Sequence, residues 1–437
     1  MKTKDLPMSA RLILHSLLFV LFWSCQKPGE HREKLMFKDP AAARLSASTA
    51  NAANPYLTKN HLGQPVLCWT EELSQEAGFV MKYAVFDPEN AAFGKVVTVG
   101  PSQGTAAHPE NMNKVAFRSD GTVLAVFSKK HPTEENRFAG SIYYTQSTNG
   151  GSSWAAPARL HSDSAKDVGR GYFDLATLPD GEVGAIWLDG RQGREIKGSA
   201  LYFAKTEGHL GFGQDKAVGT GTCECCRTDL YVDAEGTLHM AYRDILNDSI
   251  RDIVHRYSTD NGATFSEARR ISLDNWVIHG CPHTGPSLAD NAEGLHAVWF
   301  TAAGNPGVYL TATGNKEAAF SPRSKISDHA RHPQMAALPG DRLVLVWDEP
   351  ARAETHNIAA GMHGGAHNNS DNGSRITVQV RKKGRALETF SLSDEEADAT
   401  FPVLMAMSDG KTLVAWAQEE SGKSGVYYTW LDLGGSD

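Results

Sequence analysis

Six side chains that can bind soft metal ions lie in three short segments of this sequence. They are Cys223, Cys225, Cys226, Cys281, His283 and His332. Thiolate, thioether and imidazole ligands together suit copper. Cysteine and histidine ligands without a thioether also suit zinc. The spacing of the first three cysteines departs from the paired C-x2-C elements of a zinc ribbon. The pattern therefore predicts a copper or zinc site and leaves the identity of the metal open.

The same cysteines have a second interpretation. Clustered cysteines of a protein outside the cytoplasm commonly oxidise to disulfides, and four cysteines allow three pairings. Cys281 would then bridge to one of Cys223, Cys225 and Cys226. A bond between the adjacent Cys225 and Cys226 would be strained. The two cysteines left over would pair locally or stay reduced, and the metal and disulfide interpretations both stay open.

A second set of residues suits an acidic ligand. The candidate binding residues are Arg170, Arg191, Arg227, Arg243 and Arg331, with Trp276 as a ring that stacks on a sugar. The candidate acids and bases are Asp174, Asp189, Asp348 and Glu349. Arginine favours carboxylates because its planar fork donates two parallel hydrogen bonds. The competing interpretation is that these charges are solvated loop ends with no ligand.

Both sets of residues are distributed over a repeated sequence pattern. Seven stretches read as an apolar segment, a turn of the Asp-Gly kind and an alternating strand that ends in an aromatic residue, as in "GYFDLATLPDGEVGAIWLDGR" and "HPQMAALPGDRLVLVWDEP". The closing aromatics are Trp69, Phe127, Trp187, Tyr242, Trp299, Trp347 and Trp416. One hairpin cannot bury its apolar face alone, whereas a ring of repeats can.

This pattern predicts an all-β fold, a β-propeller of four-stranded antiparallel blades. In each blade the strands run A to D, with A nearest the axis. We expect seven blades, or six if the first and last repeats share one sheet. The last repeat has no clear D strand, and a segment around Leu35 to Phe37 would complete it.

Two turns carry a recognisable motif. Ser147 to Trp154 and Ser258 to Phe265 both resemble the Asp-box, S-x-D-x-G-x-x-W/F. Its acidic or amide side chain accepts backbone N–H groups, and its glycine supplies a positive φ. On these motifs the chain resembles the sialidase-like, BNR-repeat propellers over most of residues 55–433. The resemblance implies that the boxes lie on the face opposite the active site and serve as structural staples.

The resemblance also implies an activity. Sialidases use three arginines on the substrate carboxylate, a Tyr–Glu pair as nucleophile and an aspartate as acid and base, and they need no cofactor. This chain contains no Arg-Ile-Pro motif, and no Tyr–Glu pair can be matched. We therefore expect recognition or exo-type hydrolysis of an acidic glycan, and the enzyme class implied is an exo-α-sialidase-like glycoside hydrolase. A soft-metal protein and a non-catalytic interaction scaffold are the alternatives.

The topology predicts where either activity would sit. The D-to-A and B-to-C loops share one face around the channel mouth, so the starts of A strands and the ends of B strands should carry function. The B-strand ends of repeats 6, 7 and 1 are acidic, and those of repeats 2 to 4 are largely basic. The basic half of this face can bind an anionic sugar, and the acidic half can present carboxylates to it.

The N-terminus and the charge set the expected location. Basic residues precede an apolar run from Leu12 to Trp23, which is too short for a comfortable membrane span. We predict a lipoprotein signal over 1–24 with lipidation at Cys25, a tether over 25–54 and the propeller over 55–437. The protein would be a monomer of the bacterial cell envelope, in the periplasm or at the outer membrane, held to the membrane only by its lipid. A net charge of −8 argues against nucleic acid as a partner.

Overall fold

The computed structural model describes residues 42–193, 196–351, 373–394 and 397–434. The predicted signal segment, Cys25 and most of the predicted tether lie outside these ranges. So does most of the insertion between the B and C strands of repeat 6. Within the described ranges, no helix has the length and apolar character needed to cross a membrane.

The regular secondary structure of the described chain is almost entirely antiparallel strand. The first sheet consists of β2 (Ala52–Lys59), β3 (Pro65–Ser74), β4 (Gly78–Asp87), β5 (Ala92–Phe93) and β6 (Val97–Val99). The second consists of β7 (Lys114–Phe117), β8 (Val123–Lys130), β9 (Gly140–Ser147) and β10 (Ala158–Arg159). Two short 3-10 helices are η1 (Gly100–Ser102) and η3 (Gly208–Leu210).

An eight-stranded sheet follows. It consists of β11 (Arg170–Thr177), β12 (Val183–Asp189), β13 (Ser199–Lys205), β14 (Lys216–Thr222), β15 (Asp229–Val232), β16 (Leu238–Leu246), β17 (Ile250–Ser258) and β18 (Arg269–Arg270). One residue pair, Thr222 with Asp244, joins β14 to β16. Two four-stranded groups therefore meet in this sheet.

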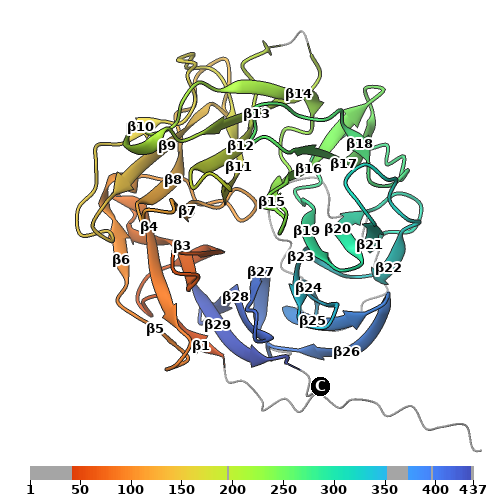
Figure 1. Cartoon of the computed structure of the whole chain (residues 1–437). Coiled ribbons are helices and arrows are strands. Elements are labelled where there is room, and N and C mark those ends of the chain that lie inside the picture. The colour runs from red at the N-terminus through yellow and green to blue at the C-terminus, as the bar shows by residue number, and fades with distance from the viewer. Residues whose placement is uncertain (1–41, 194–195, 352–372, 395–396, 435–437) are drawn as a thin grey trace, which may run out of the picture. The chain divides into compact units, whose positions relative to one another are not determined.

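Three further sheets complete the ring that Figure 1 shows. One consists of β19 (Ser287–Asn291), β20 (Gly294–Thr301), β21 (Gly307–Thr313) and β22 (Ser324–Ser327). The next consists of β23 (Arg331–Leu338), β24 (Arg342–Pro350), β25 (Ser374–Lys382) and β26 (Arg385–Ser391). The last consists of β27 (Asp398–Ala406), β28 (Lys411–Glu420), β29 (Lys423–Asp432) and β1 (Ala43–Arg44). The predicted β-propeller fold is confirmed, and the number of blades stays a prediction.

The N-terminal part of the chain completes the last sheet. In β1, Ala43 pairs with Tyr428 and Arg44 pairs with Tyr427 of β29. The pairing segment is thus Ala43–Arg44, whereas the predicted segment around Leu35 to Phe37 lies outside the described residues. Because β1 and β2 begin before residue 55, the sheets reach into the segment expected to be a tether.

The closing aromatics form the packing between neighbouring sheets. Trp69, Trp187, Trp299 and Trp416 are each at most 1% exposed. Trp69 of β3, for example, belongs to one apolar cluster with Val403 of β27. Burying a large apolar side chain stabilises a fold by about 1.5–3 kcal/mol. The repeated aromatic therefore holds each sheet to its neighbour.

The two predicted Asp-boxes are confirmed as local staples. The Oδ1 atom of Asn149 accepts the Ser153 N–H at 2.9 Å, and that of Asp260 accepts the Thr264 N–H at 2.8 Å. Gly262 has φ +81°, where a side chain would be strained. Both boxes are C-to-D turns, at the opposite end of the strands from the starts of the A strands.

Candidate functional site

Four A strands contain a β-bulge near their start. The register of β2, β11, β23 and β27 shifts there. In each bulge one residue has a left-handed backbone, namely Asn54 (φ 61°), Tyr172 (φ 53°), His332 (φ 47°) and Phe401 (φ 51°). Such a conformation costs on the order of 1–3 kcal/mol in a residue other than glycine. Bulges re-aim side chains, and here they do so at the mouth end of the ring.

We call the group of Glu110, Arg227, His332 and Asp348 the mouth cluster. Arg227 Nη1 lies 3.5 Å from Glu110 Oε1, and His332 Nε2 lies 4.0 Å from the same oxygen. On its other side His332 Nδ1 lies 2.8 Å from Asp348 Oδ2. Glu110 lies before β7 and Arg227 before β15, whereas His332 lies in β23 and Asp348 in β24. The ring therefore brings together groups that are far apart in the sequence.

The mouth cluster is only partly satisfied. Glu110 is 2% exposed, yet its Oε2 atom has no hydrogen-bond partner among the described residues. Asp348 is better fixed, because it also accepts the Phe401 N–H at 2.8 Å. Arg227 donates to the Pro333 carbonyl at 3.2 Å. A buried carboxylate oxygen without a partner is costly and marks a place where a ligand can contribute a donor.

Two further histidines and a tyrosine adjoin the mouth cluster. The ring of His108 lies 5.8 Å from that of Tyr172 and 6.0 Å from that of His283. Burial lowers the pKa of His108 to about 4 and also lowers the pKa of His283. Burial raises the pKa of Tyr172. At neutral pH all three side chains are therefore uncharged and can donate or accept a proton in hydrogen bonds.

Below the mouth cluster, the channel holds a second charged group. Lys114 Nζ lies 2.6 Å from Asp174 Oδ1, and Asp174 Oδ2 accepts the Leu230 N–H at 2.7 Å. Burial, with Asp174 nearby, raises the pKa of Asp229 to about 7. The cavity that these residues line with Arg227 holds about 50 Å³. Ligand sites usually measure about 300–1,000 Å³, so this cavity admits only water or a small group.

The cysteines have separate partners. Cys225 and Cys281 form a disulfide, which confirms the prediction that Cys281 bridges to one of the three earlier cysteines. Cys223 and Cys226 are free, with their Sγ atoms 3.5 Å apart. The hydrogen bond from Cys226 lowers the pKa of the Cys223 thiol, and the charge of Arg251, 3.1 Å away, acts in the same direction. His283 lies beside Cys225 and Cys281, whereas His332 belongs to the mouth cluster.

Arg170, Asp189 and Arg191 lie in a different group from the mouth cluster. Arg191 Nη2 lies 2.7 Å from both Asp189 Oδ2 and Asp215 Oδ2. Arg170 pairs with Asp163 and lies 3.3 Å from Asp189. We call these five residues the closed network. The side chains of Arg170 and Asp189 are fully buried, so they stabilise the fold and are not exposed to a ligand.

The remaining predicted residues are also engaged in packing. Arg243 donates to the carbonyls of Arg251 and Phe300 at 2.8 and 3.0 Å. Its guanidinium covers the ring of Trp276, which is 5% exposed and packs against Phe300. This placement corrects the expectation that Trp276 is an open platform for a sugar. The loop that carries it folds back onto the sheet because its apolar ring is buried there.

Glu349 and Arg331 likewise have partners within the fold. Glu349 accepts the indole N–H of Trp347 at 2.8 Å and pairs with Arg375 at 2.9 Å. The Arg331 guanidinium lies 5.8 Å from the centre of the Phe300 ring. Arg331 is also paired in register with Asp348, whose charge acts on it. Of the predicted arginines and carboxylates, the structure therefore brings Arg227 and Asp348 into the mouth cluster, with Arg331 beside Asp348 and Asp174 just below.

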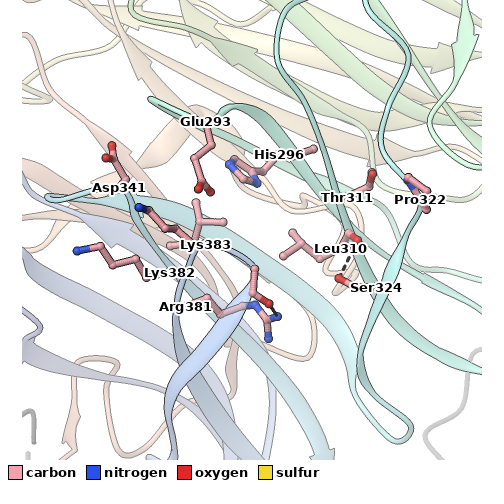
Figure 2. A pocket seen from close by; sticks show the side chains of 13 residues that line it. Glu293, His296, Leu310, Thr311, Pro322, Ser324, Asp341, Arg381, Lys382 and Lys383 are labelled. Carbon is pink, nitrogen blue, oxygen red and sulfur yellow. Dashed lines mark hydrogen bonds between the residues drawn. The ribbon is translucent and has the colours of Figure 1, made fainter. Parts of the chain in front are cut away.

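A larger cavity lies at the other end of the strands. It holds about 170 Å³, and its lining includes Glu293, Asp341 and Lys383, as Figure 2 shows. These residues belong to A-to-B and C-to-D turns. The cavity therefore shares the face of the Asp-boxes and is separate from the mouth cluster.

Sequence reasoning overlooked Glu110. It lies two residues after His108 in "HPEN", at the opening of repeat 2. The signal that could have revealed it is its repeat phase, because His332-Pro333 opens repeat 6 in the same way. Its contacts with Arg227 and His332 depend on the closed ring, which the sequence order alone does not display.

Comparisons with known proteins agree with this architecture. Residues 75–279 match the model of the BNR repeat-like domain. The structure of the polysaccharide lyase Uly1 is similar at a TM-score of 0.55 and 12% identity, over 93% of this chain and 96% of that one. The fold is therefore that of the sialidase-like β-propellers, and the resemblance stated from the sequence is confirmed.

Two other solved structures are similar at lower scores. A protein of unknown function from Dyadobacter fermentans has a TM-score of 0.49 and 10% identity, over 91% of this chain and 100% of that one. The Trypanosoma rangeli sialidase has a TM-score of 0.45 and 10% identity, over 90% and 58%. The search of curated proteins returned no match.

Proposed function

We propose that the mouth cluster binds the acidic group of a glycan and supports acid–base chemistry at its glycosidic linkage. One observation carries this proposal. Arg227, Glu110 and the His332–Asp348 pair converge from three separate segments of the chain, and Glu110 keeps a buried oxygen without a partner among the described residues. The likeness in fold to a polysaccharide lyase supports the same class of ligand.

Each residue would have a definable part. Asp348 orients the His332 ring through its contact with Nδ1, and an imidazole held in this way can take up and return a proton at Nε2. Its Nε2 atom lies 4.0 Å from Glu110 Oε1, a distance longer than a hydrogen bond. A sugar hydroxyl can therefore bridge the two atoms, since it can donate to Glu110 Oε1 and accept from His332 Nε2–H. Arg227 would contribute positive charge toward a sugar carboxylate.

The test uses the purified full chain and a panel of sialosides and uronate-containing polysaccharides. Hydrolysis is followed by new reducing ends and elimination by the absorbance of an unsaturated sugar, while binding is measured by calorimetry. We expect His332→Gln to lower turnover by about 100-fold or more, the usual contribution of a general acid or base. Exposed His329 supplies the matched control, and His329→Gln should keep wild-type turnover.

Two results would overturn the proposal. One is the absence of both binding and turnover for every glycan of the panel. The other is a folded His332→Gln protein that turns over its substrate at the wild-type rate. Thermal unfolding of each variant separates a loss of chemistry from a loss of fold.

A further inference from the structure

The free thiols lie in a compact sulfur-rich group beside the mouth cluster. Cys223, Cys225 and Cys226 follow β14 and are 1%, 6% and 1% exposed. Their three Sγ atoms all lie within 4.8 Å of one another. Cys223 is 3.5 Å from Cys226 and 3.8 Å from Cys225. Cys225 forms a disulfide with Cys281 in this structure. Reduction of that bond would leave the neighbouring thiols of Cys223, Cys225 and Cys226.

The charges around these thiols indicate an anionic ligand set. Arg251 and Arg243 are 9% and 1% exposed, and neither forms an ion pair with a carboxylate among the described residues. Arg251 Nη1 instead lies 3.1 Å from Cys223 Sγ, while Arg243 donates to backbone carbonyls. Buried cations are costly unless a negative charge compensates them. Thiolates at this position would supply that charge.

The number of ligands points to a particular ion. Thiolates are soft ligands that select Cu(I) and zinc. Structural zinc is almost always bound by four ligands around one ion, and within the described ranges no fourth histidine, cysteine or carboxylate lies close to all three of these sulfur atoms. Cys281, which reduction also frees, is grouped with Cys225 and His283 and not with Cys223 and Cys226. His283 lies close to Cys225 and Cys281 but belongs to a separate group. Three buried thiolates therefore favour a three-coordinate Cu(I) ion.

We propose that Cys223, Cys225 and Cys226 bind one Cu(I) ion when the Cys225–Cys281 disulfide is reduced. A dithiol reductant supplies two electrons and two protons, which break the S–S bond, give the thiols of Cys225 and Cys281, and convert the reductant to its own disulfide. Cu(I) then replaces the protons of three thiols, which are released to water. The disulfide and the metal are thus alternative states of Cys225.

The test measures Cu(I) on the full chain by competition with a chromogenic Cu(I) chelator under anaerobic conditions. Protein is reduced with a trialkylphosphine, which is then removed, and is compared with unreduced protein. We expect about one Cu(I) per reduced chain and at least tenfold weaker binding by the unreduced chain and by Cys223→Ser. Cys68 is also buried and free, so Cys68→Ser is the matched control and should bind as the wild type does.

A second measurement needs no variant. Cu(I) should protect Cys223, Cys225 and Cys226 of the reduced wild-type chain from alkylation, as read by mass spectrometry of the peptides. Equal binding before and after reduction, wild-type binding by folded Cys223→Ser, unprotected thiols, or zinc binding as tight as that of Cu(I) would each overturn the proposal. None of these readouts involves a glycan, so failure here leaves the proposed function untouched.

Discussion

Two groups of arginines at the mouth end of this ring differ in how completely they are paired. In the closed network, Arg191 reaches two carboxylates at 2.7 Å, and the side chains of Arg170 and Asp189 are fully buried. In the mouth cluster, the nearest carboxylate oxygen to Arg227 is 3.5 Å away and the second oxygen of Glu110 has no partner among the described residues. In the sequence the two groups could not be distinguished, because both combine arginines and carboxylates near the starts of A strands and the ends of B strands.

The difference teaches where a ligand can be recognised. In the closed network every carboxylate pairs with an arginine and every arginine with a carboxylate, so its geometry is fixed by several short contacts. The mouth cluster has longer contacts and a buried carboxylate oxygen without a partner, so it contributes less to the stability of the fold. That oxygen can still accept a hydrogen bond from a ligand. The closed network should therefore matter for folding, and the mouth cluster for function.

The largest loss of stability is expected from a substitution that disrupts the closed network. Asp189→Ala removes the carboxylate between Arg170 and Arg191 and the acceptor of the Trp187 indole N–H at 3.0 Å. Because it takes one of two carboxylates from each of two arginines and leaves the buried indole N–H without its acceptor, we expect a loss of about 3 kcal/mol in the free energy of unfolding. Denaturant unfolding measures it. The more exposed pair of Lys205 with Asp180 is the control, and Asp180→Ala should cost under about 1 kcal/mol.

The second largest effect is expected for Asp229, in the channel below the mouth cluster, and concerns how the free energy of unfolding depends on pH. Burial raises the pKa of Asp229 to about 7, above the ordinary value of 3.8. Between these two values the folded state binds more protons than the unfolded state, so this carboxyl lowers stability as pH rises from about 4 through about 7. Asp229→Asn should remove that loss.

The expected gain for Asp229→Asn is on the order of 1–2 kcal/mol at pH 8, because channel water screens part of the charge. At pH 4 the variant and the wild type should be about equally stable. Denaturant unfolding across this pH range provides the measurement. Parallel profiles for the two proteins would contradict the raised pKa of Asp229.

A smaller effect is expected on the opposite face. Asp260→Ala removes the side chain that accepts the Thr264 N–H at 2.8 Å in the second Asp-box. Because this hydrogen bond is local and solvent-exposed, we expect a loss of about 1 kcal/mol. Glycan binding should be unchanged, and a variant that lost binding while remaining folded would contradict the assignment of function to the mouth end.

The smallest effect on stability should come from the mouth cluster itself. Glu110→Gln keeps the shape of the side chain, and Arg227 keeps its bond to the Pro333 carbonyl. We expect a change under about 1 kcal/mol in the free energy of unfolding, together with loss of glycan binding. A loss as large as that of Asp189→Ala would show that the two arginine groups are equally structural and would remove the contrast between them.

The sequence predicted the local features of this protein well. Alternation and turn residues located the strands, and the two Asp-boxes form the expected hydrogen bonds. Of the two interpretations that it left open for the clustered cysteines, the disulfide between Cys281 and one of the three earlier cysteines is the one present. The sequence did not predict that Trp276 is buried, since a loop residue's exposure depends on what packs over it.

The repeat by itself determined the fold and the ends of the strands where loops gather, because alternation and turn chemistry act over a few neighbouring residues. Only the tertiary structure decided which charges meet. Arg227 and Glu110 are 117 positions apart in the chain, and their contact depends on closure of the ring and on bulges that turn side chains toward the mouth. Arg170 and Arg227 have the same side chain. Only their contacts in the folded protein make Arg170 a structural residue and Arg227 a functional candidate.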